Sequence, residues 1–478
     1  MPDYDAVVVG SGPNGLASAL TLARFGLSVI FFEAQNSLGG GTRSAELTLP
    51  GFLHDICSAI YPFSVSSPFF VGLKLAADEL ARVYSPAALA HPFDDGSAAV
   101  VEKSLENTAA RLGDDRNAYV RLFRPFVENF PILTGDLLAP LHIPSHPLIL
   151  ARFGYYATRS ACGLARKIFE GVHARSLFAG VGAHSMMPLD KSPTAAFGLV
   201  LQAAAHADGW PLIKGGSVNI ARTIEKRLRS HGVEIVTSRP IGSLGELPSA
   251  KAVLFDVTPR QLLKIVGDKF PERYRKRLER YRYGPGVFKM DWALGGPIPF
   301  KAPECSQAAT IHIGGTIDEI AASEREVCDG KASLRPFVIL AQQSLFDPSR
   351  VPPGKQSAWA YCHLPHGSDV DMTERIEAQV ERFAPGFKDL ILARHVMRPA
   401  DLEKYNANYI GGDINGGILD WGQLFARPVL RLNPYSTPLR GIFICSSSTP
   451  PGGGVHGMCG YNAARSVLKE IFKIELGK

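Results

Sequence analysis

Three glycines close to the amino terminus, Gly10, Gly12 and Gly15, have the spacing of a loop that binds the pyrophosphate of a dinucleotide. The first glycine permits a tight turn, the second lets the backbone approach the phosphates, and the third lets the following helix pack closely on a strand. The free N–H groups and the dipole at the start of that helix favour negative charge. These residues therefore predict dinucleotide binding, and the same loop contains Ser11, Pro13 and Asn14.

The residues around this loop predict the strand–helix–strand unit that must position it. Residues 6–9 form an uninterrupted apolar run, typical of a strand buried on both faces. Apolar residues recur at helical spacing over 16–23, and a second apolar run covers 27–32. This run ends at Glu33, followed by Ala34, and a carboxylate here can accept hydrogen bonds from ribose hydroxyls. An acid at this position disfavours NADP and leaves NAD and FAD as alternatives.

A second glycine cluster follows at 39–41, and it continues with Thr42, Arg43 and Ser44. Beside a bound pyrophosphate, the guanidinium of Arg43 would offer a forked pair of donors to phosphate oxygens. The alternative is a flexible loop that carries a solvated arginine. This cluster extends the predicted cofactor site to Gly40, Gly41, Thr42 and Arg43.

Near the other end of the chain, an apolar strand at 442–445 leads to the glycines 452–454 and then to a helix predicted from about Val455. This second strand–glycine–helix turn lacks the G-x-G-x-x-G spacing, and no further strand follows it. It therefore does not predict a second dinucleotide site.

On these motifs the sequence resembles the FAD-dependent phytoene desaturase and amine oxidase superfamily, and within it the phytoene-dehydrogenase-related, pyridine nucleotide-disulfide oxidoreductase-like branch. In that superfamily the first glycine loop is followed by the motif R-x-G-G-R-x-x-S/T. Here Ser37 and Gly41 stand where the two arginines usually lie, whereas Ser44 matches the end of the motif. Arg43 is placed to compensate. The resemblance implies FAD rather than NAD.

The resemblance also implies roles for residues far from the first loop. The backbone near Ile241 would contact the adenine, and the C-terminal helix would point its amino end at the isoalloxazine ring. The residues that match this C-terminal motif are Gly454, Val455, His456 and Met458. His456 is the preferred candidate for a catalytic side chain, and a helix-capping histidine without a proton-transfer role is the alternative.

Composition excludes several classes of protein. The 478 residues are 46% apolar, without a low-complexity tract or an internal repeat, which is ordinary for a globular chain. The seven cysteines form no C-x-x-C pair, so we expect a reducing compartment and no zinc ribbon or other metal site. The net charge of +6 is too small and too dispersed to predict nucleic acid as the partner. The first strand begins within five residues and no apolar run reaches bilayer length, so we expect a cytoplasmic protein.

The predicted fold class is α/β, with a Rossmann-type FAD-binding domain that is discontinuous in sequence, a mixed-sheet substrate domain and a helical insertion. Helical spacing dominates 100–209, and strand patterns return after it. The predicted segments are 1–99, 210–284 and 426–478 for the FAD-binding domain, 100–209 for a helical subdomain that faces substrate or membrane, and 285–425 for the mixed-sheet domain.

The predicted function is that of an FAD-dependent dehydrogenase or desaturase that passes a hydride from an apolar, isoprenoid- or carotenoid-like substrate to flavin N5. Molecular oxygen or a quinone would accept the electrons, and the oligomeric state is left open. One alternative is a flavin amine oxidase, for which Lys355 and Tyr461 are the candidate site residues. The other is a non-catalytic protein that binds apolar ligands or lipidated proteins on the same fold.

Two further stretches have weaker signals. His54 and Asp55 are candidates for acid–base work, but a turn is the preferred explanation for both. The segment 151–169 is basic and aromatic and contains almost no acid, so it could dock on an anionic membrane surface as a peripheral contact. The alternative is a solvated helix face.

Overall fold

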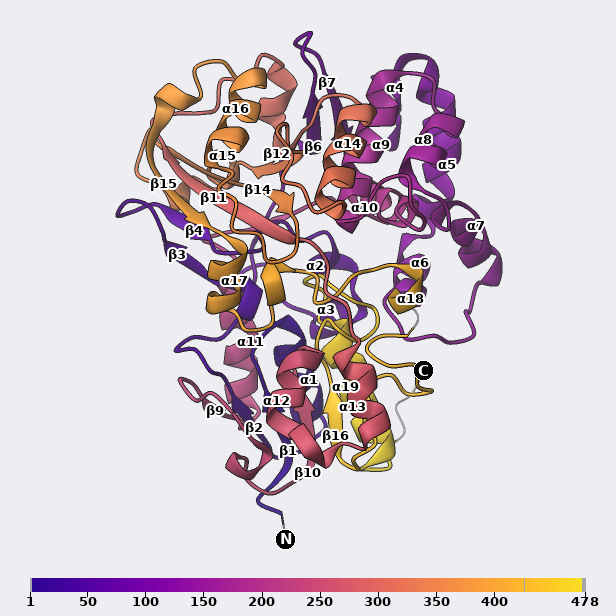
Figure 1. Cartoon of the computed structure of the whole chain (residues 1–478), viewed down its shortest axis with the longest axis vertical. Helices are drawn as coiled ribbons and strands as arrows, with labels where there is room; N and C mark the ends of the chain where they lie inside the picture. The colour runs from indigo at the N-terminus through magenta and orange to yellow at the C-terminus, as the bar shows by residue number, and fades with distance from the viewer. Residues whose placement is uncertain (1, 425, 475–478) are drawn as a thin grey trace.

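The lower lobe in Figure 1 is built on a parallel sheet. The structure is a computed structural model, and it describes residues 2–424 and 426–474. Within these residues the sheet has five strands in the order β16-β10-β1-β2-β9. Their sequences are nearly continuous apolar runs because both faces of the sheet are covered. The bounds are β1 (Tyr4–Val9), β2 (Val29–Phe32), β9 (Glu234–Val236), β10 (Ala250–Phe255) and β16 (Ile442–Ile444).

The register of this sheet aligns the carboxyl ends of its central strands. Val9 is paired with Phe32 of β2 on one side and with Phe255 of β10 on the other. The residues that follow these strands, Gly10, Glu33 and Asp256, therefore lie side by side at one edge of the sheet. Ligands of open α/β sheets bind at this carboxyl edge.

Helices cover both faces of the parallel sheet. Val8 and Phe31 share a core with residues of α1, α3, α11 and α19, whereas Val7 and Phe32 share another with residues of α12 and α13. The two cores follow from the period of two in a strand, which sends successive side chains to opposite faces. The bounds are α1 (Pro13–Ala23), α3 (Pro68–Leu73), α11 (Val218–Ser230), α12 (Pro259–Val266), α13 (Glu272–Glu279) and α19 (Met458–Glu470).

The upper lobe contains a mixed sheet with the strand order β15-β11-β14-β13-β12-β6-β7 among the described residues. Of these neighbours, β12 and β6 pair in parallel and the others are antiparallel. Its strands are β6 (Ala87–Pro92), β7 (Ala98–Glu102), β11 (Gly286–Leu294), β12 (Ala308–Ile313), β13 (Val338–Ala341), β14 (Gln356–Leu364) and β15 (Ile391–Met397). The accompanying helices are α14 (Ile317–Cys328), α15 (Gln343–Phe346) and α16 (Thr373–Phe383).

One feature of this sheet differs from the predicted segments. Strand β6 and the start of β7 come from within 1–99, the segment that the sequence assigned to the FAD-binding domain. The sequence pattern shows that a stretch is a strand, but the sheet that it joins depends on long-range pairing, here with β12 more than two hundred residues away.

The helical insertion packs against the mixed sheet on the right of Figure 1. Phe123, Leu177 and Leu199 share a core with Leu89 and Val101 of the sheet. The stretch with helical spacing is thus helical, as predicted. Its helices are α4 (Leu105–Ala110), α5 (Arg116–Glu128), α6 (Phe130–Leu137), α7 (Pro147–Ala157), α8 (Ala161–Ile168), α9 (Val172–Gly182) and α10 (Ala195–Ala207).

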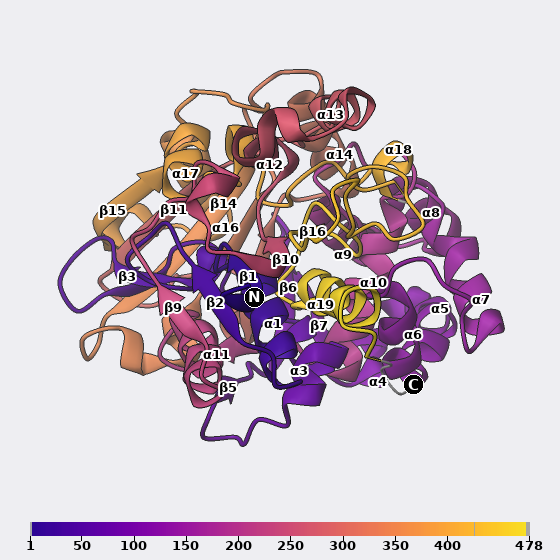
Figure 2. The same ribbon diagram turned by 90° about the horizontal axis from the view of Figure 1, so that it is seen from below.

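Short elements join the two lobes. A hairpin follows the first glycine loops, and a second short strand pair links the segments around residues 82 and 212. Figure 2 shows the parallel-sheet lobe in front of the mixed sheet on one side and the helical insertion on the other. These elements are β3 (Ser44–Glu46), β4 (Leu53–Asp55), β5 (Arg82–Val83), β8 (Leu212–Ile213), α2 (Phe63–Ser66), α17 (Pro399–Tyr405) and α18 (Trp421–Leu424). The predicted α/β fold class is confirmed.

Candidate functional site

A cavity of about 650 Å³ lies between the lobes and takes its lining from both. One end contains the carboxyl edge of the parallel sheet, and the other contains residues of the mixed sheet and the helical insertion. The predicted cofactor residues that line it are Gly10, Ser11, Gly12, Pro13, Asn14, Glu33, Ala34, Gly40, Gly41, Arg43, Ile241, Gly454 and Val455. Those that do not line it are Gly15, Thr42, His456 and Met458.

The first glycine loop leaves no space for side chains, as a pyrophosphate cradle requires. Gly10 has a φ of +99°, a conformation that favours glycine, and a Cβ there would lie 2.8 Å from the carbonyl oxygen of Asp256. A Cβ on Gly12 would lie 2.6 Å from Oδ2 of Asp256, and one on Gly15 would collide with the carbonyl oxygen of Gly10. Gly15 therefore acts through helix packing, which explains why it does not line the cavity.

Glu33 is held by the loop that it faces. Its Oε2 accepts hydrogen bonds from the backbone N–H of Ser11 (2.9 Å) and from the Ser11 hydroxyl, while Oε1 accepts from the Gln35 N–H (2.8 Å). Oε1 also lies 3.2 Å from Nη2 of Arg43. The carboxylate is thus fixed at the cavity wall, where the sequence predicted the ribose.

Arg43 is less free than the sequence suggested. Its Nε and Nη2 both donate to the carbonyl oxygen of Ser37, at 3.0 and 2.7 Å, and the guanidinium lies over the ring of Tyr405. The edge of the guanidinium formed by Nε and Nη2 is therefore already bound to the protein backbone. The role of Arg43 as a phosphate ligand remains a prediction that now involves only its remaining Nη1 group.

Asp256 is a site residue that the sequence analysis did not single out. It follows β10, is 6% exposed, and its Oδ2 accepts a hydrogen bond from the Gly15 N–H at 2.9 Å. A carboxylate thus lies at the helix N-terminus where the pyrophosphate is expected. Burial raises the pKa of Asp256 to about 7, and the charge of Glu33 acts in the same direction. An acid directly after a buried strand is the signal that could have identified it.

This pKa predicts that cofactor affinity depends on pH. Above pH 7 the ionised Asp256 would repel the bound pyrophosphate, so the dissociation constant of FAD should rise as the pH increases through about 7. Because the pKa of Asp256 is raised in the folded state, the folding stability falls as the pH rises from about 4 to about 7, and it levels off above that range. Asp256→Asn should flatten the pH profile of FAD binding, measured by flavin fluorescence quenching. An unchanged slope in this variant would contradict the assignment.

Only part of the C-terminal motif lines the cavity. Gly454 and Val455 line the cavity, but helix α19 begins at Met458 rather than at about Val455, because Gly457 adopts a left-handed conformation (φ 69°). His456 is 1% exposed, and its Nδ1 accepts a hydrogen bond from the Met458 N–H at 3.0 Å. This contact supports the helix-capping alternative for His456, and its catalytic role stays a prediction. Burial lowers its pKa to about 4.

The far part of the cavity is an apolar chamber. Val200 and Leu201 come from α10, and Ile339 and Ala341 come from β13. Apolar and aromatic side chains dominate its walls, as in most small-molecule sites. The chamber is further lined by Ile60, Phe63, His184, Phe197, Trp210, Thr310, Trp359 and Tyr361.

A buried ion pair lies in the floor of the cavity. Lys289 of β11 lines the cavity, is 3% exposed, and donates to both carboxylate oxygens of Asp291 at 2.6 Å. Burial raises the pKa of Asp291, but Lys289, His395 and His54 together outweigh burial, so the pKa of Asp291 is lowered. His54 lies 3.6 Å from this carboxylate, and burial lowers its pKa to about 4. The signal for this pair is two charges at alternate positions of an otherwise apolar strand.

The residues that the sequence offered for an amine oxidase lie elsewhere. Lys355 precedes β14 and Tyr461 belongs to α19, and neither lines the cavity. Two lysines, Lys289 and Lys404, line the cavity. The aromatic neighbours of Lys289 are Trp359 and Tyr361, whose ring centroids lie 5.6 Å apart.

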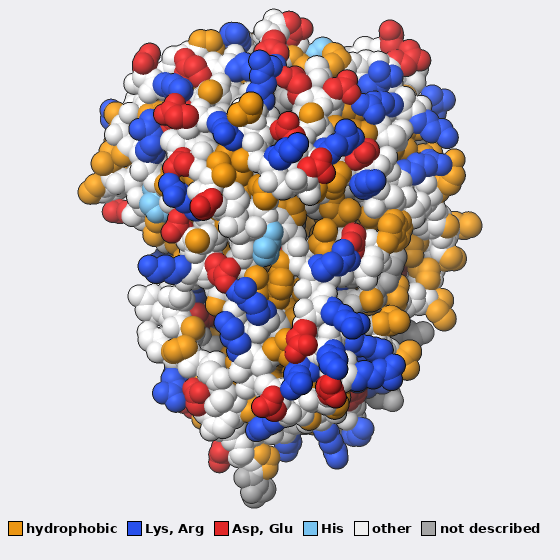
Figure 3. Space-filling model, in the orientation of Figure 1, with side chains coloured by type: hydrophobic (Ala, Val, Ile, Leu, Met, Phe, Trp, Pro, Cys, Tyr) orange, Lys and Arg blue, Asp and Glu red, His pale blue; other side chains and the backbone are white. Residues whose placement is uncertain are grey.

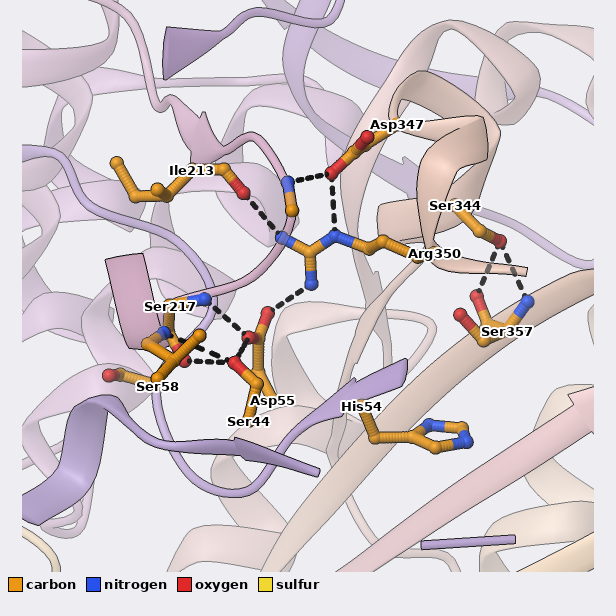
Figure 4. A network of polar contacts seen from close by, with 12 residues as sticks. Ser44, His54, Asp55, Ser58, Ile213, Ser217, Ser344, Asp347, Arg350 and Ser357 are labelled. Atoms are coloured by element: carbon orange, nitrogen blue, oxygen red, sulfur yellow. Dashed lines mark hydrogen bonds and ion pairs between the residues drawn. The ribbon is translucent and has the colours of Figure 1, made fainter. Parts of the chain in front are cut away.

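Asp55 has a structural role. Its Oδ1 accepts from the Ser44 hydroxyl and the Ser217 N–H, and its Oδ2 accepts from Nη1 of Arg350. Arg350 also donates to Asp347 and to the carbonyl oxygen of Ile213 (Figure 4). This cluster ties the hairpin after the glycine loops to the upper lobe, and His54 points away from it in the same view. The predicted acid–base role of Asp55 is therefore replaced by an ion pair.

Fold and site together define a dinucleotide-binding protein of the oxidoreductase type, with a cofactor cradle that opens into an apolar chamber. The cradle fits the predicted FAD, because glycines face it where a Cβ would intrude and Glu33 is fixed at its ribose end. The group of three or more His, Cys, Asp or Glu side chains that a metal site needs does not occur among residues 2–424 and 426–474.

Comparison with known proteins gives the same class. A family described as the NAD(P)-binding Rossmann-like domain matches residues 8–69. The chain is 24% identical to pyridine nucleotide-disulfide oxidoreductase domain-containing protein 2 of Rattus norvegicus, over 98% of this chain and 94% of that protein. It is 22% identical to one of the limonene dehydrogenase subunits of Castellaniella defragrans, over 98% and 95% of the two chains. The structure of putrescine oxidase bound to putrescine superposes with a TM-score of 0.62 at 17% identity, over 98% and 99%.

These likenesses confirm the resemblance to FAD-dependent oxidoreductases, the enzyme class and FAD as the cofactor. The substrate is a separate question, because one fold serves many reactions. No helix of the described residues is long and apolar enough to cross a bilayer.

Proposed function

We propose that the protein is an FAD-dependent dehydrogenase of an apolar, isoprenoid-like substrate. The observation that carries this proposal is the continuity of one cavity from the glycine cradle to the apolar chamber. A relative that covers nearly the whole chain is named for limonene, a small isoprenoid hydrocarbon, which supports the same substrate class.

The chain's own contribution is to orient the substrate and to exclude water. The chamber walls from α10 and β13 are apolar and belong to one buried core, so an apolar molecule would be held by burial of its surface. When bound, FAD would accept a hydride from one C–H bond, and the proton lost from the neighbouring carbon would pass to solvent as the double bond forms. The hydride transfer itself needs no acid–base side chain.

One specific observation favours the amine oxidase alternative. Lys289, Trp359 and Tyr361 together line the chamber, and an ammonium beside aromatic rings is suited to a polar reacting group. However, Lys289 is neutralised by Asp291 at 2.6 Å, so this carboxylate is not free to bind a substrate ammonium.

Product analysis tests the proposal. The FAD-loaded enzyme is incubated with limonene, with a linear polyene and with putrescine, each in air and with a soluble quinone in the absence of oxygen. We expect products with two fewer hydrogens from the isoprenoids and none from the diamine, and the comparison of acceptors shows whether oxygen or quinone is used. Oxidation of the amine alone would overturn the proposal in favour of an amine oxidase.

We further propose a peripheral membrane contact at the start of α7. Leu141, Ile143 and Leu148 are 74%, 94% and 83% exposed, and Arg152 lies exposed on the same helix. Figure 3 shows apolar side chains gathered along this edge of the upper lobe. These three exposed apolar residues precede the basic segment 151–169, which the sequence suggested as the membrane contact, and Phe153 of that segment is buried. Ile143→Ser with Leu148→Ser should reduce co-sedimentation with phosphatidylserine vesicles, and undiminished binding would contradict the contact.

A further inference from the structure

A histidine pair closes one end of the apolar chamber. His184, in the 3-10 turn after α9, lines the cavity, and its Nε2 lies 2.9 Å from Nε2 of His312 on β12. The ring of His184 also contacts Trp210, with centroids 6.1 Å apart. The function proposed above uses neither histidine.

A third histidine continues the pair into the core. The parallel register pairs Ile311 of β12 with Ala90 of β6, so His312 and His91 occupy adjacent positions on neighbouring strands. Nδ1 of each is buried without a hydrogen-bond partner, and both nitrogens face Gly180, where a Cβ would lie 3.0 and 3.3 Å from them. A side chain at position 180 would crowd both nitrogens.

Burial disfavours the charged form of all three rings. Burial lowers the pKa of His91 to about 4 and that of His184 to about 3, and it holds the pKa of His312 well below the ordinary value. Each ring therefore carries one N–H and one lone pair. The distribution of these hydrogens follows from the contacts.

The contacts of the three rings indicate which nitrogen of each ring carries the hydrogen. Nε2 of His91 donates to the carbonyl oxygen of Gly315 at 2.6 Å, so its Nδ1 carries the lone pair. If the hydrogen of His312 lies on Nδ1, the Nδ1 atoms of His91 and His312 do not both carry a lone pair beside Gly180. The lone pair of His312 then lies on Nε2, where it accepts a hydrogen bond from Nε2–H of His184. Nδ1 of His184 is then an unprotonated acceptor, and it belongs to the one ring of the three that lines the cavity.

We propose that His184 is a specificity-determining residue, which accepts a hydrogen bond from a hydroxyl or another neutral donor on the otherwise apolar substrate. His312 is a positioning residue that fixes the tautomer of His184. The inference rests on the proposed function, since it narrows the substrate from an apolar hydrocarbon to an apolar molecule with one polar end. A neutral acceptor surrounded by apolar walls increases the affinity for a ligand that carries a hydrogen-bond donor, and it forms no hydrogen bond with a plain hydrocarbon.

The test compares two ligands that differ by one hydroxyl. Geraniol and its hydrocarbon analogue without the hydroxyl are titrated anaerobically into the FAD-loaded protein, whose flavin has been reduced with dithionite so that no turnover occurs. Binding is followed by tryptophan fluorescence, because Trp210 and Trp359 line the cavity. We expect geraniol to bind about three- to tenfold more tightly than the hydrocarbon.

Variants assign this preference to the histidine. His184→Phe should abolish the preference while it leaves hydrocarbon binding within about twofold, and His184→Asn, which keeps an acceptor near the position of Nδ1, should restore part of it. His312→Leu should weaken the preference, and His312→Gln should retain it. Equal affinities of the two ligands for the wild type, no binding of either, or a preference that survives in His184→Phe would overturn the inference. Geraniol selectivity without oxidation of any isoprenoid would instead refute the proposed function alone.

Discussion

Replacing Arg350 with methionine should lower the free energy of unfolding by about 3–5 kcal/mol, the cost of removing one partner from a buried ion pair. The guanidinium is 1% exposed and contacts Asp55 and Asp347, and its loss would leave both carboxylates buried without their cation. Methionine keeps much of the volume of the side chain, so a cavity contributes little. Urea unfolding followed by circular dichroism measures the effect.

An exposed ion pair supplies the control for this variant. Arg166 and Asp318 lie on the surface, and Arg166→Met should change stability little because solvent screens such pairs. Adding Asp55→Asn to Arg350→Met should recover part of the loss, since the second change removes one stranded charge. A loss below about 1 kcal/mol for Arg350→Met would show that the cluster in Figure 4 does not hold the lobes together.

Gly12→Asp should weaken FAD binding by more than about a hundredfold, because a new carboxylate would be forced into the cradle beside Asp256. The first side-chain atom at position 12 would already lie 2.6 Å from Oδ2 of Asp256. The like charges would repel each other and also the pyrophosphate. The flavin absorbance retained after gel filtration measures the effect.

Gly154→Ala is a matched control for the glycine change. Gly154 lies in α7, and a Cβ there would meet no atom within 4 Å. This variant should keep its full content of FAD. If Gly12→Asp also retained FAD while folding normally, the glycine loop would not be the cofactor cradle.

The local part of the architecture could be predicted from the sequence. The strand–glycine–helix–strand unit is encoded in consecutive residues, so period and spacing suffice to locate Gly10, Gly12 and Glu33 at one edge of a parallel sheet. The helical character of 100–209 follows from the same kind of pattern. The cofactor class then came from the resemblance of both ends to a known superfamily.

The chamber could not be predicted, because tertiary packing assembles it. His184 and His312 are 128 positions apart and meet only through the packing of the helical insertion on the mixed sheet. Lys289 looked like one residue of an ordinary alternating strand, and only the fold shows that it faces a cavity. The start of the last helix was predicted at about Val455 but lies at Met458, because Gly457 adopts a left-handed conformation that the residue pattern does not reveal.

The most direct test of FAD-dependent isoprenoid oxidation is an anaerobic absorbance spectrum of the purified, FAD-loaded protein before and after addition of an isoprenoid. We expect an oxidised flavin spectrum that bleaches when the isoprenoid is added and does not change with an aliphatic amine. Bleaching by the amine alone, or a protein that binds isoprenoid but cannot be loaded with FAD, would contradict the proposed function.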